Sequence, residues 1–566
     1  MTSKATASTA ARSAGITETD VLIVGAGPVG AALAIELGLR GIRVHLVEQV
    51  PEIGSWWTRA MNANKRTMEH LRRWGVAQSL KDINYVPKDW PGNVTLVQTL
   101  GGSAITCVRG EGLGWHRVLD DSAEDSLWVA QGQMQQVLLR RARELGAVIE
   151  MRAQATAIEE GEAGEGGPVR VQVRQDGAER WFHARYVVGC DGARSFVRES
   201  AGLSYQGGGV LSRVIALFFD APGLLDDMRR RGIPDSVMYL CAQPQVRGLA
   251  RLVQGSRWEL QVNLLEDQTA DGVDPEALVR LAIGPDIAFT FERSFPFSYY
   301  DLIADRYGRR HVFIAGDATH IIPPLGGHNL NLGVGDAVNL GWKLAHVLRG
   351  WAGDELLDSY TPERRGMALR TKGEVLANHD RLFSTFALLA QWLAIEGDDD
   401  AAQARRKRMG EDIGVHLRPQ WRNDGIVLDQ RYTGSPIVAA AEAPAREIPY
   451  DPQRNIAWCA PGHRAPMHRD AQGTALYDRF GAEYTLLDIG SGSAGMQAMR
   501  QLLAAGWPVK HLPIDDPELR NRYGCALALI RPDQHVAWCG EQFPSDAQAL
   551  LDRLAGRARV AQPLAA

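Results

Sequence analysis

The chain has 566 residues, of which 45% are hydrophobic and 23% are charged. At roughly 150 residues per domain, this length predicts three to four structural units with a large core. It excludes a small disulfide scaffold, and the composition excludes a wholly disordered chain. The formal net charge of −5 lacks the basic field that is typical of nucleic-acid-binding proteins. We therefore expect a folded protein that binds small molecules and no nucleic acid.

The cysteines, the N-terminus and the apolar stretches bear on the compartment. The six cysteines form no CxxC pair and no zinc-ligand spacing, which indicates a reducing, cytoplasmic compartment and no metal site. Residues 1–19 are rich in Ala, Ser and Thr without an apolar segment, so we expect a disordered leader. The longest apolar stretch, 383–395, is too short to span a bilayer. No membrane association is expected.

Residues 20–48 predict a strand, a tight turn, a helix and a second strand. The turn carries Gly25, Gly27 and Gly30 in GxGxxG spacing, and Glu48 ends the second strand. In dinucleotide-binding units the first glycine makes the turn, the second lets a pyrophosphate approach, and the third lets helix and strand pack closely. The acid accepts a hydrogen bond from a ribose hydroxyl. This unit predicts a nucleotide site, with a plain glycine-rich turn as the alternative.

The rest of the chain can be divided by its patterns. Residues 206–300 are short β-like runs between polar turns, which predict an antiparallel sheet inserted as its own layer. A helical stretch, 375–410, ends in a charge run that we interpret as a solvated linker. We expect a leader at 1–19, a discontinuous dinucleotide-binding domain at 20–205 and 301–385, the sheet domain at 206–300, a helical linker at 386–430, and a last α/β domain at 431–566.

A second GxGxxG pattern lies in that last block. Gly490, Gly492 and Gly495 follow a strand-like run and precede a helical one, and Asp515 follows at the next strand. By pattern this could be a nicotinamide site. Too few residues follow for a complete dinucleotide domain, so an ordinary loop between strand and helix is favoured.

Two later motifs place loops at the carboxyl ends of buried strands, where open α/β sheets bind ligands. They are CDGARSFVR at 190–198 and GDATHIIPPLGGHNLNLGVGDAVNLGWKLA at 316–345. With the first glycine motif, in this order, they give a chain that resembles the flavoprotein aromatic hydroxylases, the single-component FAD monooxygenases similar to p-hydroxybenzoate hydroxylase and phenol hydroxylase. Residues 431–566 resemble the thioredoxin-like C-terminal domain of the phenol and polyketide hydroxylase branch, without its CxxC.

The resemblance implies an α/β fold, α+β overall: a Rossmann-like FAD-binding domain with an inserted antiparallel-sheet substrate domain, plus a C-terminal thioredoxin-like domain. It also implies a set of FAD and NAD(P)H contacts. These are Gly25, Gly27, Pro28, Val29, Gly30, Glu48, Arg59, Gln131, Asp191, Gly192, Gly316, Asp317, Pro324, Gly327, Asn329, Leu330 and Asn331.

Four of these contacts have specific implied roles, each with a plainer alternative. Asp317 resembles the acid that binds the FAD ribityl chain, and a helix cap is the alternative. Asp191 with Gly192 resembles the shared FAD and NAD(P)H fingerprint, and a type I turn is the alternative. Arg59 resembles the arginine that contacts the pyrophosphate and the nicotinamide side, or is a surface cation. Gln131 resembles a glutamine near the ribityl chain, or is a helix cap.

The resemblance also implies catalytic roles for Arg59, Pro324 and His328. The two prolines at 323 and 324 make a rigid wall, and the following helix start stabilises negative charge at flavin N1 and O2. This sequence carries Asn329 where the family usually has glycine, and His328 where Gln or Lys is common. A solvated or core histidine is the alternative for His328.

The implied reaction is reduction of FAD by NAD(P)H, reaction with O2 to a C4a-hydroperoxyflavin, and oxygen transfer to a phenolic or polycyclic aromatic substrate. Candidate partners for the phenol are Tyr239, Tyr299, Tyr300 and His116, with a core aromatic as the alternative for each. Two other functions stay open: Baeyer–Villiger insertion or epoxidation of a natural-product substrate, and a nucleotide-binding module without chemistry. A homodimer is compatible with the C-terminal domain.

Overall fold

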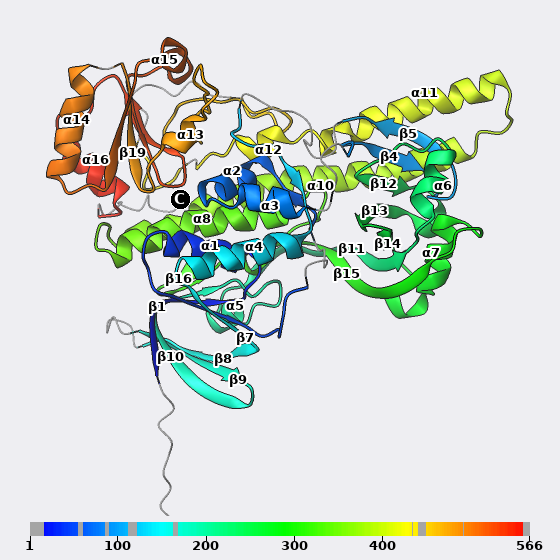
Figure 1. The fold of residues 1–566 in the computed structure, drawn as a ribbon, viewed down its shortest axis with the longest axis horizontal. Coiled ribbons are helices and arrows are strands. Elements are labelled where there is room, and N and C mark those ends of the chain that lie inside the picture. Colours follow the sequence, from blue (N-terminus) through cyan, green and yellow to red (C-terminus); the bar gives the residue numbers. More distant parts are fainter. Residues whose placement is uncertain are drawn as a thin grey trace, which may run out of the picture.

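The structure is a computed structural model that describes residues 16–54, 60–84, 86, 90–110, 121–161, 168–432, 434–439, 449–490 and 492–557. Two candidate residues, Arg59 and His116, lie outside these ranges, as does most of the expected leader. The described chain forms two large sheets and a smaller C-terminal sheet, and the C-terminal sheet and the second sheet lie at opposite ends of the molecule (Figure 1).

The first sheet has a parallel centre in the strand order β17, β10, β1, β2 and β7. Its strands are apolar runs because helices cover them, with α1, α4 and α8 side by side above the sheet in Figure 1. The strands are β1 (Thr17–Val24), β2 (Val44–Glu48), β7 (Val148–Met151), β8 (Ala153–Glu159), β9 (Val169–Gln175), β10 (Ala178–Gly189), β16 (Gly308–Arg309) and β17 (Val312–Ile314). The helices packed on this part are α1 (Pro28–Gly38), α2 (Lys65–Arg73), α3 (Ala77–Ile83), α4 (Gln131–Glu144), α5 (Phe196–Ser200) and α8 (Asn329–Leu348).

The second sheet has the order β18, β15, β11, β14, β13, β12, β4 and β5. It is antiparallel apart from the parallel pair β4–β12, and it takes β4, β5 and β18 from outside the 206–300 segment. Its strands are β4 (Val94–Val97), β5 (Ala104–Val108), β11 (Tyr205–Asp220), β12 (Met238–Cys241), β13 (Gly248–Gln254), β14 (Arg257–Asn263), β15 (Thr290–Ala304) and β18 (His320–Ile321). Helices α6 (Leu224–Arg230) and α7 (Pro275–Ile283) pack with it, and β3 (Asn62–Ala63) pairs with β6 (Leu127–Trp128) in a separate ribbon.

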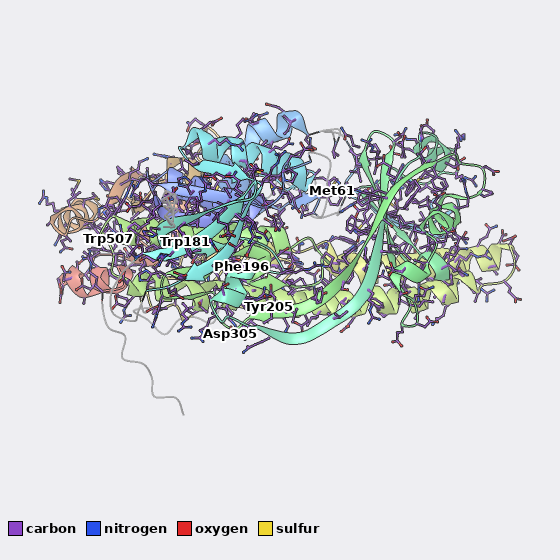
Figure 2. All side chains as sticks on the ribbon, turned by 90° about the horizontal axis from the view of Figure 1, so that it is seen from below. Met61, Trp181, Phe196, Tyr205, Asp305 and Trp507 are labelled. Atoms are coloured by element: carbon purple, nitrogen blue, oxygen red, sulfur yellow. The ribbon has the colours of Figure 1, made fainter. Side chains whose placement is uncertain are left out.

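Two long strands connect the sheets. β11 and β15 pair along most of their length, and Figure 2 shows Tyr205 and Asp305 together at one end, near Phe196 of α5. From there the strands run across the molecule into the second sheet. These two strands therefore fix the position of the second sheet relative to the first, which carries the three sequence motifs.

A helical hairpin links the second sheet to the C-terminal region. It consists of α10 (Tyr360–Leu393) and α11 (Asp400–Leu417), and α11 packs on β5. Asp399 begins α11, with its carboxylate accepting the Ala402 N–H at 2.7 Å. The short helices α9 (Glu355–Asp358) and α12 (Asp424–Leu428) flank the hairpin. Within the described ranges, no helix combines the length and apolarity needed to cross a membrane.

The C-terminal domain is a mixed four-stranded sheet in the order β20, β19, β21, β22, with helices around it, as expected for a thioredoxin-like fold. Its elements are α13 (Leu476–Arg479), β19 (Tyr484–Ile489), α14 (Ser493–Ala504), β20 (Val509–Ile514), α15 (Pro517–Tyr523), β21 (Leu527–Ile530), β22 (Val536–Gly540) and α16 (Ala547–Leu554).

A buried ionic contact fixes this domain to the rest of the protein. Arg531, just after β21, donates to both carboxylate oxygens of Glu363 in α10, at 2.7 and 2.8 Å. Lys343 of α8 lies 2.7 Å from the same carboxylate, and all three side chains are fully buried. Because buried charges are costly unless paired, this contact requires the two domains to stay docked.

Candidate functional site

Three loops meet at the carboxyl ends of β1, β10 and β17, because these are neighbouring parallel strands. Gly25 has φ +105°, and a Cβ there would lie 2.4 Å from the carbonyl oxygen of Cys190. Gly316 has φ +68°, and a Cβ there would lie 2.9 Å from Val29 Cγ2. The three sequence motifs therefore interlock through positions that only glycine can fill.

The first motif leaves a helix N-terminus open. A Cβ on Gly30 would lie 2.1 Å from the Gly25 oxygen, whereas a Cβ on Gly27 would meet nothing within 4 Å. Pro28 opens α1, and no side chain caps its first N–H groups. An open, uncapped helix start is the arrangement that holds a pyrophosphate, so these residues fit FAD.

Two side chains fix the turn itself. The Ala26 N–H donates to the Glu48 carboxylate at 2.8 Å, and Gln135 of α4 donates to the Ala26 oxygen at 2.6 Å. Gln131, the residue proposed from the sequence, is one helical turn earlier, at the start of α4. Its backbone N–H donates to the Ala60 oxygen at 3.0 Å. Gln135 was missed, although its i, i+4 spacing from Gln131 places it on the same helix face.

In the second loop, the Asp191 carboxylate accepts hydrogen bonds from residues of the same motif. The Asp191 carboxylate accepts hydrogen bonds from the Val197 N–H at 3.0 Å and from the Ser195 hydroxyl, at the start of α5. Burial raises the pKa of Asp191, although these hydrogen bonds favour its charged form. Gly192 has φ +80°, and a Cβ there would meet nothing within 4 Å. Asp191 thus shapes the turn, and Gly192 leaves space beside it.

Asp336, which the sequence analysis missed, anchors the third loop. Its carboxylate accepts hydrogen bonds from the Gly316 N–H at 3.1 Å and from Arg364 at 2.9 Å, and lies 2.9 Å from His320 Nε2. Burial opposes its ionisation, but the charges of His320 and Arg364 outweigh burial and hold the pKa of Asp336 below its usual value. Asp336 lies within the 316–345 motif, so the sequence contained it, but the sequence did not show which residues it contacts.

Asp317 and the proline wall lie beside this anchor. Asp317 is half-buried in a short 3-10 turn, and Tyr205 donates to its backbone oxygen at 2.5 Å. Pro323 is buried, whereas Pro324 is exposed and so faces space that a ligand can occupy. Leu330 is half-buried in the first turn of α8.

Two asparagines shape the loop between Ile322 and α8. Asn329 accepts the Ile322 N–H at 3.2 Å and donates to the Ile322 oxygen at 2.6 Å. Asn331 donates to the Gly327 oxygen at 2.6 Å and accepts the Asn64 N–H at 2.9 Å. The side chain of Asn329 therefore fixes the loop through two hydrogen bonds to Ile322. The glycine that is usual in the family has no side chain and cannot make them.

His328 comes directly before α8 and is 3% exposed. Burial lowers the pKa of its imidazole to about 4, so the ring is neutral near pH 7. Its Nε2 has no hydrogen-bond partner among the described residues, and a Cβ on Gly326 would lie 2.5 Å from that atom. His328 is therefore not a solvated histidine: it is a buried ring with an unsatisfied nitrogen beside the loop.

The candidate tyrosines lie at different places. Tyr239 belongs to the core cluster under α6 and α7, where its hydroxyl accepts the Ser236 N–H at 3.0 Å. Its neighbours Met238 and Leu240 face the other way and pack with Leu325. The structure therefore does not bring Tyr239 to the loops. Tyr299 is buried, which raises the pKa of its hydroxyl, and Tyr300 is half-buried.

The second GxGxxG pattern is a loop between β19 and α14. A Cβ on Gly495 would lie 1.8 Å from a carboxylate oxygen of Asp488. The start of α14 therefore already faces a carboxylate, which disfavours a phosphate there.

Comparison with known proteins agrees with this geometry. A family described as "FAD binding domain" matches residues 18–372, and one described as "Aromatic-ring hydroxylase, C-terminal" matches residues 459–558. The chain belongs to the FAD-dependent aromatic-ring hydroxylases. The resemblance and the fold class expected from the sequence are confirmed for this hydroxylase.

The chain is similar to enzymes with different names and substrates. Aklavinone 12-hydroxylase RdmE of Streptomyces purpurascens is 30% identical, over 94% of this chain and 98% of that protein. The 4-methyl-5-nitrocatechol 5-monooxygenase of a Burkholderia species is also 30% identical, over 94% and 96%. The rebeccamycin biosynthetic enzyme RebC, solved with reduced flavin, has a TM-score of 0.85 at 28% identity, over 96% of this chain and 100% of RebC.

Proposed function

We propose that this hydroxylase consumes NAD(P)H and O2 and hydroxylates a phenolic or polycyclic aromatic compound. The observation that carries the proposal is the open, uncapped start of α1 beside Gly27, interlocked with the other two motif loops. Relatives that act on aklavinone and on a nitrocatechol support the substrate class. In this proposal residues 20–205 and 301–385 bind FAD, 206–300 supply most of the substrate roof, 386–430 link, and 431–566 form the C-terminal domain.

The chain would hold FAD through its backbone more than through side chains. The N–H groups at the start of α1, with Gly25, Gly27, Pro28, Val29 and Gly30, would bind the pyrophosphate, and Glu48 the adenosine ribose. Asp317 and Gln131 would bind the ribityl chain, while Asp191, Gly192 and Arg59 would contact FAD and the nicotinamide. Bound FAD would supply electron transfer and oxygen activation.

The start of α8 would lie beside the flavin ring, the reactive part of FAD. Its first N–H groups, from Asn329 to Asn331, have no side-chain cap and would favour a negative charge beside Gly327 without any rearrangement. Because His328 is neutral near pH 7, it adds no charge that would vary with pH beside this helix start. The exposed ring of Pro324 would form a wall for the substrate and exclude water.

The second sheet offers the aromatic surface that such a substrate needs. The face that carries Met238 and Leu240 also carries Phe218, Phe295 and Phe297, by the alternation of side chains along paired strands. Within it, Arg251 and Glu259 form a buried ion pair at 2.6 Å. Aromatic rings with polar side chains among them suit a flat ring system that bears polar groups.

The six cysteines are free thiols, which supports the proposed cytoplasmic location. A homodimer stays a prediction.

The test is O2-dependent oxidation of NADH and NADPH by the purified yellow protein against phenols, acyl-phenols and polycyclic quinones, with the product mass and structure recorded. We expect one class to stimulate oxidation and to gain one oxygen as a ring hydroxyl. Flavin-free protein is the control for background oxidation. A lactone or an epoxide as product would contradict aromatic hydroxylation, and a protein that binds no flavin would contradict the proposal as a whole.

A further inference from the structure

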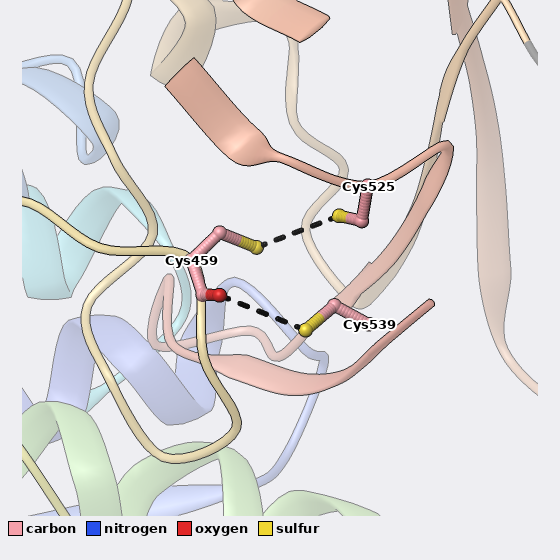
Figure 3. A group of neighbouring side chains, drawn as sticks. All are labelled: Cys459, Cys525 and Cys539. Atoms are coloured by element: carbon pink, nitrogen blue, oxygen red, sulfur yellow. Dashed lines mark hydrogen bonds between the residues drawn. The ribbon is translucent and has the colours of Figure 1, made fainter. Parts of the chain in front are cut away.

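Three cysteines that are far apart in the sequence come together in the C-terminal domain. Cys459 lies in the segment before α13, Cys525 just before β21, and Cys539 in β22. Their sulfur atoms all lie within 4.8 Å of one another (Figure 3). Their sequence spacing did not show this proximity, because it arises from the sheet, which folds the three segments to one point.

The spacing of the sulfur atoms fits ligands of one ion. The Sγ atoms of Cys459 and Cys525 are 3.8 Å apart, and Cys539 Sγ donates to the Cys459 carbonyl oxygen at 3.7 Å. Two thiolates on one tetrahedral zinc ion, with bonds of about 2.3 Å, stand ~3.8 Å apart. A disulfide would need a sulfur separation of about 2.05 Å and would leave the third thiol unused.

Burial of the cluster suits a site with one open side. Cys459 and Cys525 are buried, and Cys539 is half-buried. Apolar side chains, including Leu519 and Ile530, surround the two buried thiols. An ion could therefore enter past Cys539, with its fourth position open to water.

We propose that Cys459, Cys525 and Cys539 form a binding site for one thiophilic metal ion, with Zn²⁺ as the expected occupant. The ion would replace the thiol protons and join the 449–475 segment to the strand pair β21–β22. That segment also reaches the FAD-binding part, because Arg464 pairs with the buried Glu69 of α2 at 2.5 Å. The site would thus stabilise the docking of the two domains, and it does not depend on the proposed reaction.

The experiment uses the flavin-containing protein, reduced and freed of metal by a chelator, and Co²⁺ alone as the probe. We expect one equivalent to give thiolate-to-cobalt charge-transfer bands and ligand-field bands in the red, beyond the absorption of oxidised flavin. Added Zn²⁺ should abolish these bands. In Cys539→Ser the apparent affinity for Co²⁺ should fall at least ~10-fold. Cys107→Ser, a half-buried cysteine outside the cluster, should bind as the original chain does.

A second measurement guards against misfolding of the variant. In the unaltered chain, Zn²⁺ should slow the reaction of three thiols with a disulfide reagent. For Cys539→Ser, the flavin content and the thermal unfolding curve should show that the variant is folded. Absence of cobalt–thiolate bands with the three thiols reduced would overturn the proposal. Equal Co²⁺ affinity in folded Cys539→Ser would overturn it as well.

Discussion

Gly27→Ala should separate cofactor binding from folding. Gly27 has φ −58° and ψ 172°, which alanine adopts freely, and its Cβ would meet nothing within 4 Å. The unfolding free energy of the flavin-free protein should therefore change by less than about 0.5 kcal/mol. With FAD bound, the added methyl group would stand where the pyrophosphate approaches the backbone. Overpacking of about 1–3 kcal/mol corresponds to a roughly 5- to 150-fold loss of FAD affinity.

The assay is FAD titration of the flavin-free protein, followed by quenching of flavin fluorescence, with thermal unfolding measured in parallel. Gly373→Ala is the matched control, because Gly373 lies exposed inside α10 and its Cβ would also meet nothing within 4 Å. It should leave FAD affinity unchanged and stabilise the protein by about 0.5–1 kcal/mol.

Gly30→Ala gives the opposite pattern, because its Cβ would lie 2.1 Å from the Gly25 oxygen. It should destabilise the flavin-free protein as well as weaken FAD binding. If Gly27→Ala bound FAD as tightly as the unaltered chain, the pyrophosphate would not lie over this loop. If it unfolded as readily as Gly30→Ala, the assignment of open space at Gly27 would be refuted.

Three further predictions concern stability, each measured by denaturant unfolding. Asn329→Ala removes two hydrogen bonds to Ile322 and should cost about 1–3 kcal/mol; no loss would show that the loop keeps its shape without them. Arg531→Ala leaves Glu363 with one buried cationic partner fewer and should cost about 3–5 kcal/mol. As the pH is lowered from about 6.5 to 4, His328 takes up a proton in the unfolded state but not in the folded state. The free energy of unfolding should therefore decrease by up to about 3 kcal/mol over this range. His328→Gln should remove that part of the slope.

Two comparisons sharpen these predictions. Arg174→Ala, which breaks an exposed ion pair with Glu179, should cost at most about 1 kcal/mol, so an equal loss in Arg531→Ala would contradict the role of burial. For His328→Gln, an unchanged pH slope would mean that the folded imidazole takes up its proton at the ordinary pKa.

The sequence by itself determined the family and the fold class, through the resemblance that its three motifs carry. The motif loops follow from local features: buried apolar runs bounded by glycines whose positive φ or close contacts exclude other residues, as at Gly25 and Gly316. Short β-like runs between polar turns also predicted the sheet strands within 206–300, because such runs can be recognised within one segment.

Only the tertiary structure decided which side chains from distant segments come together. Gln135 reaches Ala26, Asp336 holds Gly316, and the thiols of Cys459 and Cys539 meet near one point. Tyr239 was a candidate substrate contact, but it lies in the core under the helices. Alternation divides the side chains of a strand between two faces but does not say which face the helices cover. Local sequence fixes the backbone of a motif, whereas contacts between distant segments depend on how whole elements pack, and no single stretch of sequence carries that information.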